Sequence, residues 1–229
     1  VPSSTLENIV KICSTQYAFV ALDSSNKAIV WGHSSYGGNP GANDVTNVKE
    51  IYTTQTSVAL LKNNNSVVSW GQHNAGGTIT DVSSVSVSYL AFAVVKTNGT
   101  VVTWGNSGYG GDSSSVSGQL TNIVKIFSGT KAFFALKNDG TLVTWGNSTT
   151  GDSSSVSAQL TNIANVWAND TIAIAMKNNG ELVAWGTNFV HANENKISDI
   201  GKIGTTKNLY TQYKENIYSL PFLGINSPQ

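Results

Sequence analysis

The stretch from Asn122 to Gly146, NIVKIFSGTKAFFALKNDGTLVTWG, decides the fold because the chain contains six versions of it. In this version Trp145 follows Asn122 by 23 positions. Four other versions keep the same distance from an Asn or Asp to a Trp, and a sixth has Phe in place of the Trp. The six modules cover residues 8–31, 47–70, 81–104, 122–145, 162–185 and 199–222.

Each module consists of short apolar runs that favour β-strands. Val, Ile, Phe, Ala and Thr fill these runs, and no stretch shows the sustained 3.6-residue periodicity of an amphipathic helix. Asn98-Gly99 and Asp139-Gly140 lie between the second and third runs of their modules. These pairs predict a type I′ turn, in which both central residues have positive φ. Each module is therefore predicted to be one strand followed by a tight hairpin.

All variation in length falls in the connecting segments, between the Trp of one module and the start of the next. Two of these segments are near-copies, GNSGYGGDSSSVSGQLT at 105–121 and GNSTTGDSSSVSAQLT at 146–161. Their Gly and Ser content predicts loops. We expect a short edge strand at the SVS stretch in each.

A repeat of about 40 residues is too small to bury a core alone, so the modules must pack against one another. Small all-β units of this size are usually the blades of a propeller. We therefore expect an all-β fold, a single β-propeller domain over residues 1–229 with about six short blades, or seven if a repeat is missing. The chain ends, residues 1–7 and 223–229, are expected to complete one blade together.

The order NIVKI, then A-x-x-AL, then N-G-x-φ-φ-x-W-G resembles the regulator-of-chromosome-condensation (RCC) repeat, in a short-blade variety. Residues 132–136, Asp139-Gly140 and Trp145-Gly146 form the clearest copy, and the resemblance covers nearly the whole chain. It implies a β-propeller. It implies no single function, because the family includes a nucleotide-exchange factor for a small GTPase, bacterial effectors and a secreted β-lactamase inhibitor.

Two functions of that family do not transfer to this sequence. The exchange factor uses an inserted wedge and acidic loops, and the connecting segments here are too short and too polar to supply them. Binding to chromatin needs basic ends, and VPSSTLE and LGINSPQ contain no Lys or Arg.

The composition argues against nucleic-acid and membrane partners. Thirteen basic residues balance thirteen acidic ones, and charged residues make up only 11% of the chain. No field therefore attracts nucleic acid, and no apolar run reaches the roughly 18 residues of a membrane span. The single cysteine, Cys13, excludes an internal disulfide. The start at Val1 rather than Met fits a processed protein or an excised domain. Sequons at Asn64, Asn98, Asn147 and Asn169, on a neutral surface with few lysines, favour a location outside the cell or at its surface.

Catalytic and metal-binding patterns are absent from the sequence. His33, His73 and His191 come from three different modules, so we do not expect them to share a zinc ion. Asp112 and Asp152 lie in GDSSS tracts that lack the spacing of a calcium loop and favour Asx turns. The chain has no G-x-S-x-G elbow and no phosphate-binding loop. We predict that the protein is not an enzyme and has no cofactor or metal.

The aromatic residues of the connecting segments are the candidate binding residues. Small polar residues surround them, and such aromatics on a rigid β scaffold are typical of recognition surfaces. The candidates are His33, Tyr36, His73, Tyr109, Phe189 and His191. Alternatively, Tyr36 and Tyr109 cover the edges of blades.

The repeated aromatics at the ends of the modules have two interpretations. They are Trp31, Trp70, Trp104, Trp145, Trp185 and Phe222. They could form an aromatic ring on one face of the propeller, but we favour a structural role, in which they fill the space between neighbouring blades.

From these observations we predict a non-enzymatic recognition or adhesion module that is secreted or at the cell surface. Its expected partner is a protein, bound through the loops after each Trp-Gly. The alternative is a lectin that stacks a carbohydrate on its aromatic residues. A weaker alternative is an effector or regulator that binds a small GTPase.

Overall fold

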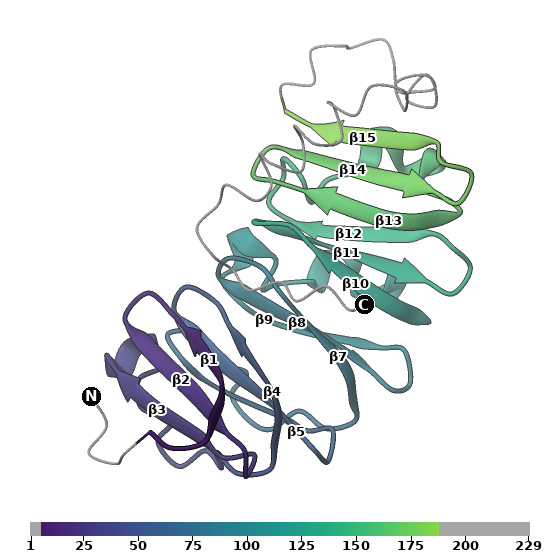
Figure 1. Ribbon diagram of the computed structural model, residues 1–229. Helices are drawn as coiled ribbons and strands as arrows, with labels where there is room; N and C mark the ends of the chain where they lie inside the picture. The colour runs from purple at the N-terminus through teal and green to yellow at the C-terminus, as the bar shows by residue number, and fades with distance from the viewer. Residues whose placement is uncertain (1–5, 188–229) are drawn as a thin grey trace, which may run out of the picture.

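The computed structural model describes residues 6–187, which contain the first five modules. Each of these modules forms one three-stranded antiparallel sheet, here called blades 1 to 5. The blades follow one another along a curved array (Figure 1). The sixth module, residues 199–222, and the ends 1–5 and 223–229 lie outside the described residues, so the number of blades and the sharing of one blade by the two ends stay predictions.

The strand bounds repeat from blade to blade. Blade 1 contains β1 (Ile9–Ser14), β2 (Ala18–Asp23) and β3 (Ala28–Gly32). Blade 2 contains β4 (Val48–Thr53), β5 (Ser57–Lys62) and β6 (Val67–Gly71). Blade 3 contains β7 (Val82–Val87), β8 (Ala91–Lys96) and β9 (Val101–Gly105). Blade 4 contains β10 (Ile123–Ser128), β11 (Ala132–Lys137) and β12 (Leu142–Gly146). Blade 5 contains β13 (Ile163–Ala168), β14 (Ile172–Lys177) and β15 (Leu182–Gly186).

The strand-then-hairpin prediction is confirmed, but the type I′ turn is wrong. In blade 3 the N–H of Gly99 donates to the carbonyl of Lys96 at 2.9 Å, and Gly99 has a φ of 77° while Asn98 is not among the residues with positive φ. The loop is therefore a type I turn closed by a left-handed glycine. Asn98 has a different role, because its Oδ1 accepts from the N–H and the hydroxyl of Thr100 at 3.1 and 2.7 Å.

The residue that opens each module adopts the left-handed conformation. Asn8, Asn47, Asp81, Asn122 and Asn162 have φ values between 53° and 60°. Asn and Asp tolerate this region better than other residues with a side chain, which explains why every module begins with one of them.

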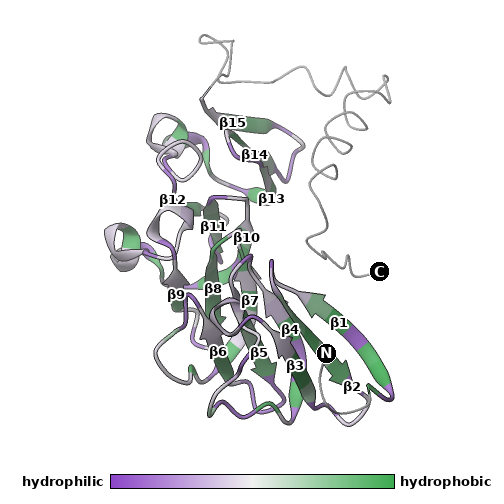
Figure 2. Cartoon of the chain, turned by 90° about the vertical axis from the view of Figure 1, so that its left-hand side faces the viewer, coloured by the Kyte–Doolittle hydropathy of each residue, from purple (hydrophilic) through white to green (hydrophobic). Residues whose placement is uncertain are grey.

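The core lies between blades rather than within them. One apolar cluster combines Ala91, Ala93 and Val95 of β8 with Ile126 and Phe133 of blade 4. Three further clusters join blades 1 and 2, 2 and 3, and 4 and 5 in the same way. Figure 2 shows the hydrophobic colour concentrated in the strands. A blade is therefore stabilised by its two neighbours, as expected for a unit too small to fold alone.

Backbone hydrogen bonds also join successive blades, at the turns between their first and second strands. These bonds run from Gln16 N to Gln55 O at 2.8 Å, from Gln55 N to Tyr89 O at 3.0 Å and from Tyr89 N to Thr130 O at 3.0 Å. The residues all lie eight positions after the opening Asn or Asp, so the ladder repeats with the modules.

The expectation of an edge strand at the SVS stretches is wrong. Both stretches lie in 3₁₀ helices, η3 (Ser114–Gln119) and η4 (Ser154–Gln159). Each begins just after an aspartate whose carboxylate accepts the N–H two residues later, and each places a valine against the core between blades. This local turn chemistry decides the structure, whereas the β-propensity of Val would favour a strand.

Candidate functional site

The connecting segments all leave the blades on one side of the array. In blade 1, Gly32 at the end of β3 pairs with Ala18 at the start of β2. The turn between the first and second strands therefore lies beside the connecting segment, and this pairing repeats in every described blade. We call this side, made of these turns and the segments after each Trp-Gly, the Trp–Gly rim. Figure 2 shows the coils that follow blades 3 and 4 on this side.

The glycine after each Trp is required by close packing at this rim. At Gly105 φ is +123°, and a Cβ would lie 2.5 Å from both the Leu90 carbonyl oxygen and the Ala91 Cα. Those atoms are backbone and have no room to move aside. A side chain at this position would therefore separate the second and third strands.

The repeated tryptophans lie between blades. Trp70, Trp104, Trp145 and Trp185 are only 3–6% exposed. Three of them also hold the preceding connecting segment in place through the indole N–H. These hydrogen bonds run from Trp70 to Gly37 O at 2.8 Å, from Trp145 to Gly110 O at 2.9 Å and from Trp185 to Thr150 O at 2.8 Å. Most of the aromatic area is thus used in packing and is not presented to a partner.

Trp104 differs from the other three. The connecting segment before its blade is the short one, between Gly71 and Asp81, and it forms no 3₁₀ helix. The buried Nε1 of Trp104 has no hydrogen-bond partner among the described residues. Trp31, in the first blade, is only half-buried, and Phe222 lies outside the described residues.

Hydroxyl groups fix the tyrosine-containing segments to the rim. Thr15 Oγ1 donates to the Tyr36 carbonyl at 2.7 Å, and Ser88 Oγ donates to the Tyr109 carbonyl at 2.7 Å. Thr15 and Ser88 occupy the same position of their modules. The backbone at Tyr36 and Tyr109 is therefore held independently of the two phenol rings.

The structure brings two of the candidate residues together in blade 1 and adds a third aromatic. The ring of Tyr36 lies edge-on to His33 at 5.2 Å and to Tyr17 at 4.7 Å, measured between centroids. His33 is exposed, Tyr36 is half-buried and Tyr17 is 55% exposed. We call these three residues the aromatic cluster. Sequence reasoning missed Tyr17 because its position in the other described modules holds Thr, Leu, Lys and Thr.

The remaining candidates lie apart from this cluster along the chain. Tyr109 is half-buried, packs against the core between blades 3 and 4, and has its ring 5.7 Å from that of Tyr89, so part of it covers a blade edge. His73 is half-buried in the segment after blade 2, and its backbone N–H donates to Ser57 Oγ at 2.9 Å. Phe189 and His191 lie outside the described residues.

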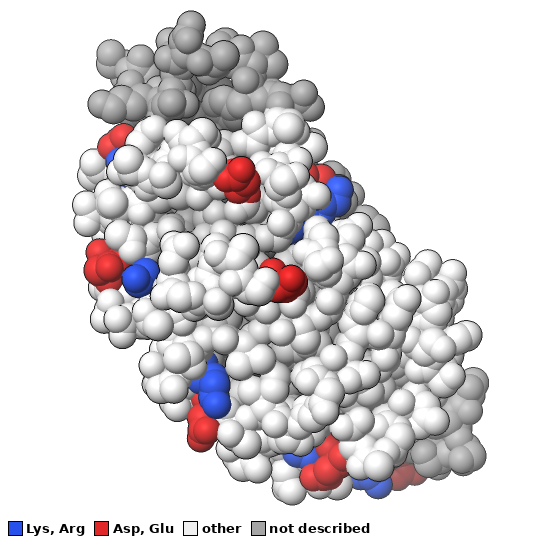
Figure 3. Space-filling model, turned by 180° about the vertical axis from the view of Figure 1, so that it is seen from behind, with Lys and Arg blue, Asp and Glu red and all other residues white. Residues whose placement is uncertain are grey.

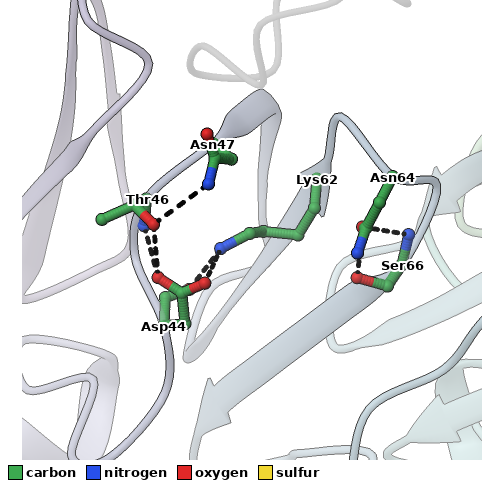
Figure 4. Close-up of polar contacts among 6 residues, drawn as sticks. All are labelled: Asp44, Thr46, Asn47, Lys62, Asn64 and Ser66. Carbon is green, nitrogen blue, oxygen red and sulfur yellow. Dashed lines mark hydrogen bonds and ion pairs between the residues drawn. The ribbon is translucent and has the colours of Figure 1, made fainter.

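Charged side chains are few on the face seen in Figure 3 and do not gather into a patch. The ion pair between Lys62 and Asp44 has a structural role (Figure 4). Lys62 Nζ lies 2.8 Å from Asp44 Oδ2 and donates to the Asp44 carbonyl at 2.9 Å, although the lysine side chain is only 6% exposed. Hydrogen bonds from Lys62 and then from Thr46 hold the pKa of the Asp44 carboxyl well below its usual value. This pair joins the first connecting segment to blade 2.

The acidic tracts behave as turns. Asp112 and Asp152 each accept the N–H two residues ahead at 2.9 Å, and hydrogen bonds to the backbone and side chain of that serine lower the pKa of both carboxyls. Over residues 6–187 no group of three or more His, Cys, Asp or Glu side chains could hold a metal. Cys13 packs half-buried against blade 2, and this burial raises the pKa of its thiol.

No helix in the described part of the chain is long and apolar enough to cross a membrane.

Comparisons with known proteins identify the fold. No family model matches the sequence, and no curated protein matches it. Among solved structures, yeast RCC1 (Prp20) bound to Kap60 is 16% identical, with a TM-score of 0.50 over 78% of this chain and 56% of the other. Prp20p from Saccharomyces cerevisiae is 17% identical, with a TM-score of 0.50 over 78% of this chain and 57% of the other.

A plant protein shows the same likeness. The ectodomain of the receptor kinase CR4 from Physcomitrella patens is 16% identical, with a TM-score of 0.51 over 81% of this chain and 54% of the other. The chain thus spans little more than half the length of these structures. Together with the Trp-Gly repeats and the three-stranded blades, these matches show that the chain has the fold of an RCC1-type β-propeller.

Proposed function

We propose that the protein is a non-enzymatic recognition module that binds a protein partner through its Trp–Gly rim. The aromatic cluster is the observation that carries this proposal. Tyr17 is 55% exposed, and its ring is held against Tyr36 rather than buried in a core. Exposed tyrosines on a rigid scaffold provide large contact areas at a low entropic cost, which is a common property of protein-binding surfaces.

The charge distribution supports an uncharged partner surface. Asp44, Lys62 and the carboxylates of the GDSSS turns are already used in contacts within the chain. Charged residues make up only 11% of the chain, and acidic and basic residues are equal in number, so we expect binding that is driven by apolar contacts and depends weakly on salt.

The structural neighbours also support a protein partner. Yeast RCC1 (Prp20) was solved bound to Kap60, and Prp20p was described together with its binding to Gsp1p and histones. A shared fold does not show that two proteins have the same partner. The described connecting segments are also too short and too polar for the wedge that an exchange factor would use. We therefore favour a general protein-binding role over the binding of a small GTPase.

We also propose that the module acts outside the cell or at its surface, in recognition or adhesion. The support is the set of sequons and the small number of charges. The Physcomitrella patens neighbour is itself an ectodomain. Addition of an N-glycan to Asn98, which is exposed in its hairpin, would support this setting if the native protein carries it.

Photocrosslinking tests the proposed surface. A photoreactive amino acid is introduced at position 17, and in a control at position 124, where the natural valine is 58% exposed on β10 and not part of the Trp–Gly rim. We expect position 17, and not 124, to crosslink to a discrete protein, and Tyr36→Ala to weaken its capture at least 10-fold. Equal crosslinking at both positions would overturn the proposal.

A glycan array distinguishes the lectin hypothesis from the protein-binding hypothesis. Stacking of a sugar on Tyr17 or Tyr36 would give array signals that are lost in Tyr36→Ala. Such signals in the absence of any protein crosslink would favour the carbohydrate alternative.

A further inference from the structure

A pair of hydrogen-bond donors holds each tyrosine-containing segment to the rim, and the pair binds two successive carbonyls. After blade 1, Thr15 Oγ1 donates to the Tyr36 carbonyl at 2.7 Å. Trp70 Nε1, from the next blade, donates to the adjoining Gly37 carbonyl at 2.8 Å. The equivalent bonds after blade 3 run from Ser88 Oγ to Tyr109 O at 2.7 Å and from Trp145 Nε1 to Gly110 O at 2.9 Å.

The same pair of donors is present after blade 2, but the described chain supplies no pair of carbonyls to it. Thr54 stands seven positions after Asn47, where blades 1 and 3 have Thr15 and Ser88, and Trp104 is the Trp of the next blade. The Thr54 hydroxyl donates only within its own turn, to Ser57 O at 3.4 Å, and Trp104 Nε1 has no partner among residues 6–187.

These donors are buried, and a third buried polar group lies beside them. Thr56, two residues after Thr54 in the same turn, has a hydroxyl that is also without a partner in the described chain. Thr54, Thr56 and Trp104 are only 1%, 5% and 6% exposed. A buried donor without a partner is costly, so three such groups at one place indicate a site for hydrogen-bond acceptors.

The connecting segment after blade 2 has the glycines of the other segments but is held in a different position. Gly76 and Gly77 follow Trp70 by six and seven positions, as Gly37 and Gly38 follow Trp31. Two serines of blade 2 bind the backbone of this segment at 2.9 Å, Ser57 at the N–H of His73 and Ser69 at the N–H of Ala75. No other described blade has a serine at either of these positions.

Because of these bonds, no glycine turn fills the space between blades 2 and 3. A Cβ on Gly37 or Gly110 would lie 2.7 or 2.6 Å from a side chain of the next blade, whereas one on Gly76 would have no atom within 4 Å. Ala75 packs against the core cluster that contains Trp104, so the segment lies over this place without supplying an acceptor.

We propose that Thr54 and Trp104, with Thr56 beside them, form a slot that binds a glycine-containing turn of a protein partner. Two successive carbonyls of that turn accept from the Thr54 hydroxyl and the Trp104 indole, and the turn displaces residues 75–77. Glycine is required because Gly37 and Gly110, which fill the equivalent places, have φ values of 91° and 90°. This inference rests on the proposed function, since the slot is part of the Trp–Gly rim, and it names the chemistry that the slot recognises.

Two other acceptors compete for the slot, the chain's own Gly76 carbonyl and a water molecule. The Gly76 carbonyl takes the place of Gly37 or Gly110 only if the backbone leaves Ser57 and Ser69. A water molecule satisfies donors but makes none of the contacts that Gly37 and Gly110 make with the next blade.

An NMR titration of the full chain with a peptide tests the slot. The probe is NSGYGGD, residues 106–112, because the equivalent donor pair holds this segment after blade 3. We expect the peptide to shift the indole N–H signal of Trp104 until saturation and to leave the signals of Trp70 and Trp145 unchanged. The same peptide with Gly110→Ala and Gly111→Ala is the control, and it should bind at least about 10-fold more weakly because alanine disfavours the left-handed turn.

The double variant Ser57→Ala, Ser69→Ala distinguishes a partner from the chain's own segment. Alanine stands at these positions in other blades, at Ala18 and Ala184, so the fold tolerates the change. Without the two serine bonds residues 75–77 give way more easily, and the peptide should bind at least about 3-fold more tightly. A Trp104 signal that shifts in this variant without peptide, together with loss of peptide binding, would overturn the proposal in favour of the Gly76 carbonyl.

The wild-type titration decides the proposal even if that variant does not fold. No saturable shift of the Trp104 signal up to about 10 mM peptide would overturn it, as would equal shifts of all three tryptophans. The titration uses purified protein and a synthetic peptide, and its failure leaves the crosslink at position 17 to decide the proposed function. Failure of the crosslink alone would leave the peptide result standing.

Discussion

A comparison of Trp145→Phe with Trp104→Phe separates the packing of the repeated tryptophans from their hydrogen bonds. The two indoles are 3% and 6% exposed, and each stacks on a Phe of its own blade, at 5.5 and 5.0 Å. They differ in one respect, since Trp145 donates to the Gly110 carbonyl at 2.9 Å while the Nε1 of Trp104 is without a partner in the described chain.

The expected magnitudes follow from this difference. Replacing Trp by Phe removes on the order of 50 Å² of buried apolar surface at either position, which costs about 1 kcal/mol of unfolding free energy. At Trp145 the Gly110 carbonyl also loses its donor in a buried place, which costs about 1–2 kcal/mol more. At Trp104 the change removes an unsatisfied donor, and this gain of about 1 kcal/mol or more offsets the lost packing. Trp145→Phe is therefore expected to cost at least about 2 kcal/mol more than Trp104→Phe.

Urea unfolding followed by circular dichroism measures the difference. With an m value of about 2.5 kcal/mol per M, the midpoint for Trp145→Phe should lie at least about 0.8 M below that for Trp104→Phe. Trp185→Phe, which removes the bond to Thr150, should behave like Trp145→Phe. Equal midpoints for the Trp104 and Trp145 variants would refute the role given to the indole hydrogen bond.

Three further predictions concern the backbone and one ion pair. Gly105→Ala should lower the unfolding free energy by about 2 kcal/mol or more, because Gly105 has a positive φ and its Cβ would lie 2.5 Å from backbone atoms. Gly118→Ala, the control, should change the unfolding free energy little. Gly118 has open space around it, and the near-copy segment at 146–161 has Ala158 at the same position. Asn122→Ala should cost about 1 kcal/mol at its φ of 56° and Asn122→Gly clearly less, both measured by urea midpoint; equal costs would contradict the left-handed assignment. Because Lys62 lowers the pKa of Asp44 in the folded state, the stabilisation by Asp44 is complete above its unfolded pKa of about 4 and is lost as the pH falls through the folded value. Asp44→Asn should thus be less stable than wild type at pH 7, with a difference that narrows below about pH 4; a difference that is constant with pH would contradict this.

Most of the fold could be predicted because the same spacing recurs in several modules, so that the prediction does not depend on the identity of any one residue. The distance of 23 positions from Asn122 to Trp145 recurs in four other modules, and it predicts that the strands of the described blades begin and end at equivalent positions. The turn type could not be predicted from Asn98-Gly99 alone, because this pair suits both a type I′ turn and a type I turn with a left-handed glycine. The register that selects between them depends on the pairing of the flanking strands.

The connecting segments and the candidate site were harder to predict because they depend on contacts between segments. The SVS stretches have β-propensity, but no neighbouring strand pairs with them and the Asx turns at Asp112 and Asp152 start a 3₁₀ helix instead. His33 and Tyr36 are near in sequence and lie together, whereas Tyr17 joins them only through the pairing of β2 with β3. The absence of a repeated residue at the Tyr17 position is a signal that could have identified it, since repeated positions are used for packing.

The central claim is that the modules are the blades of one β-propeller, as the five described modules are. From this claim we predict that the full chain forms a closed, compact ring. Small-angle X-ray scattering of the full chain tests this claim most directly. A compact chain of this length should have a radius of gyration of about 17 Å that does not change with protein concentration. A value well above about 20 Å, or one that rises with concentration, would contradict the closed ring and indicate an open array or association between copies.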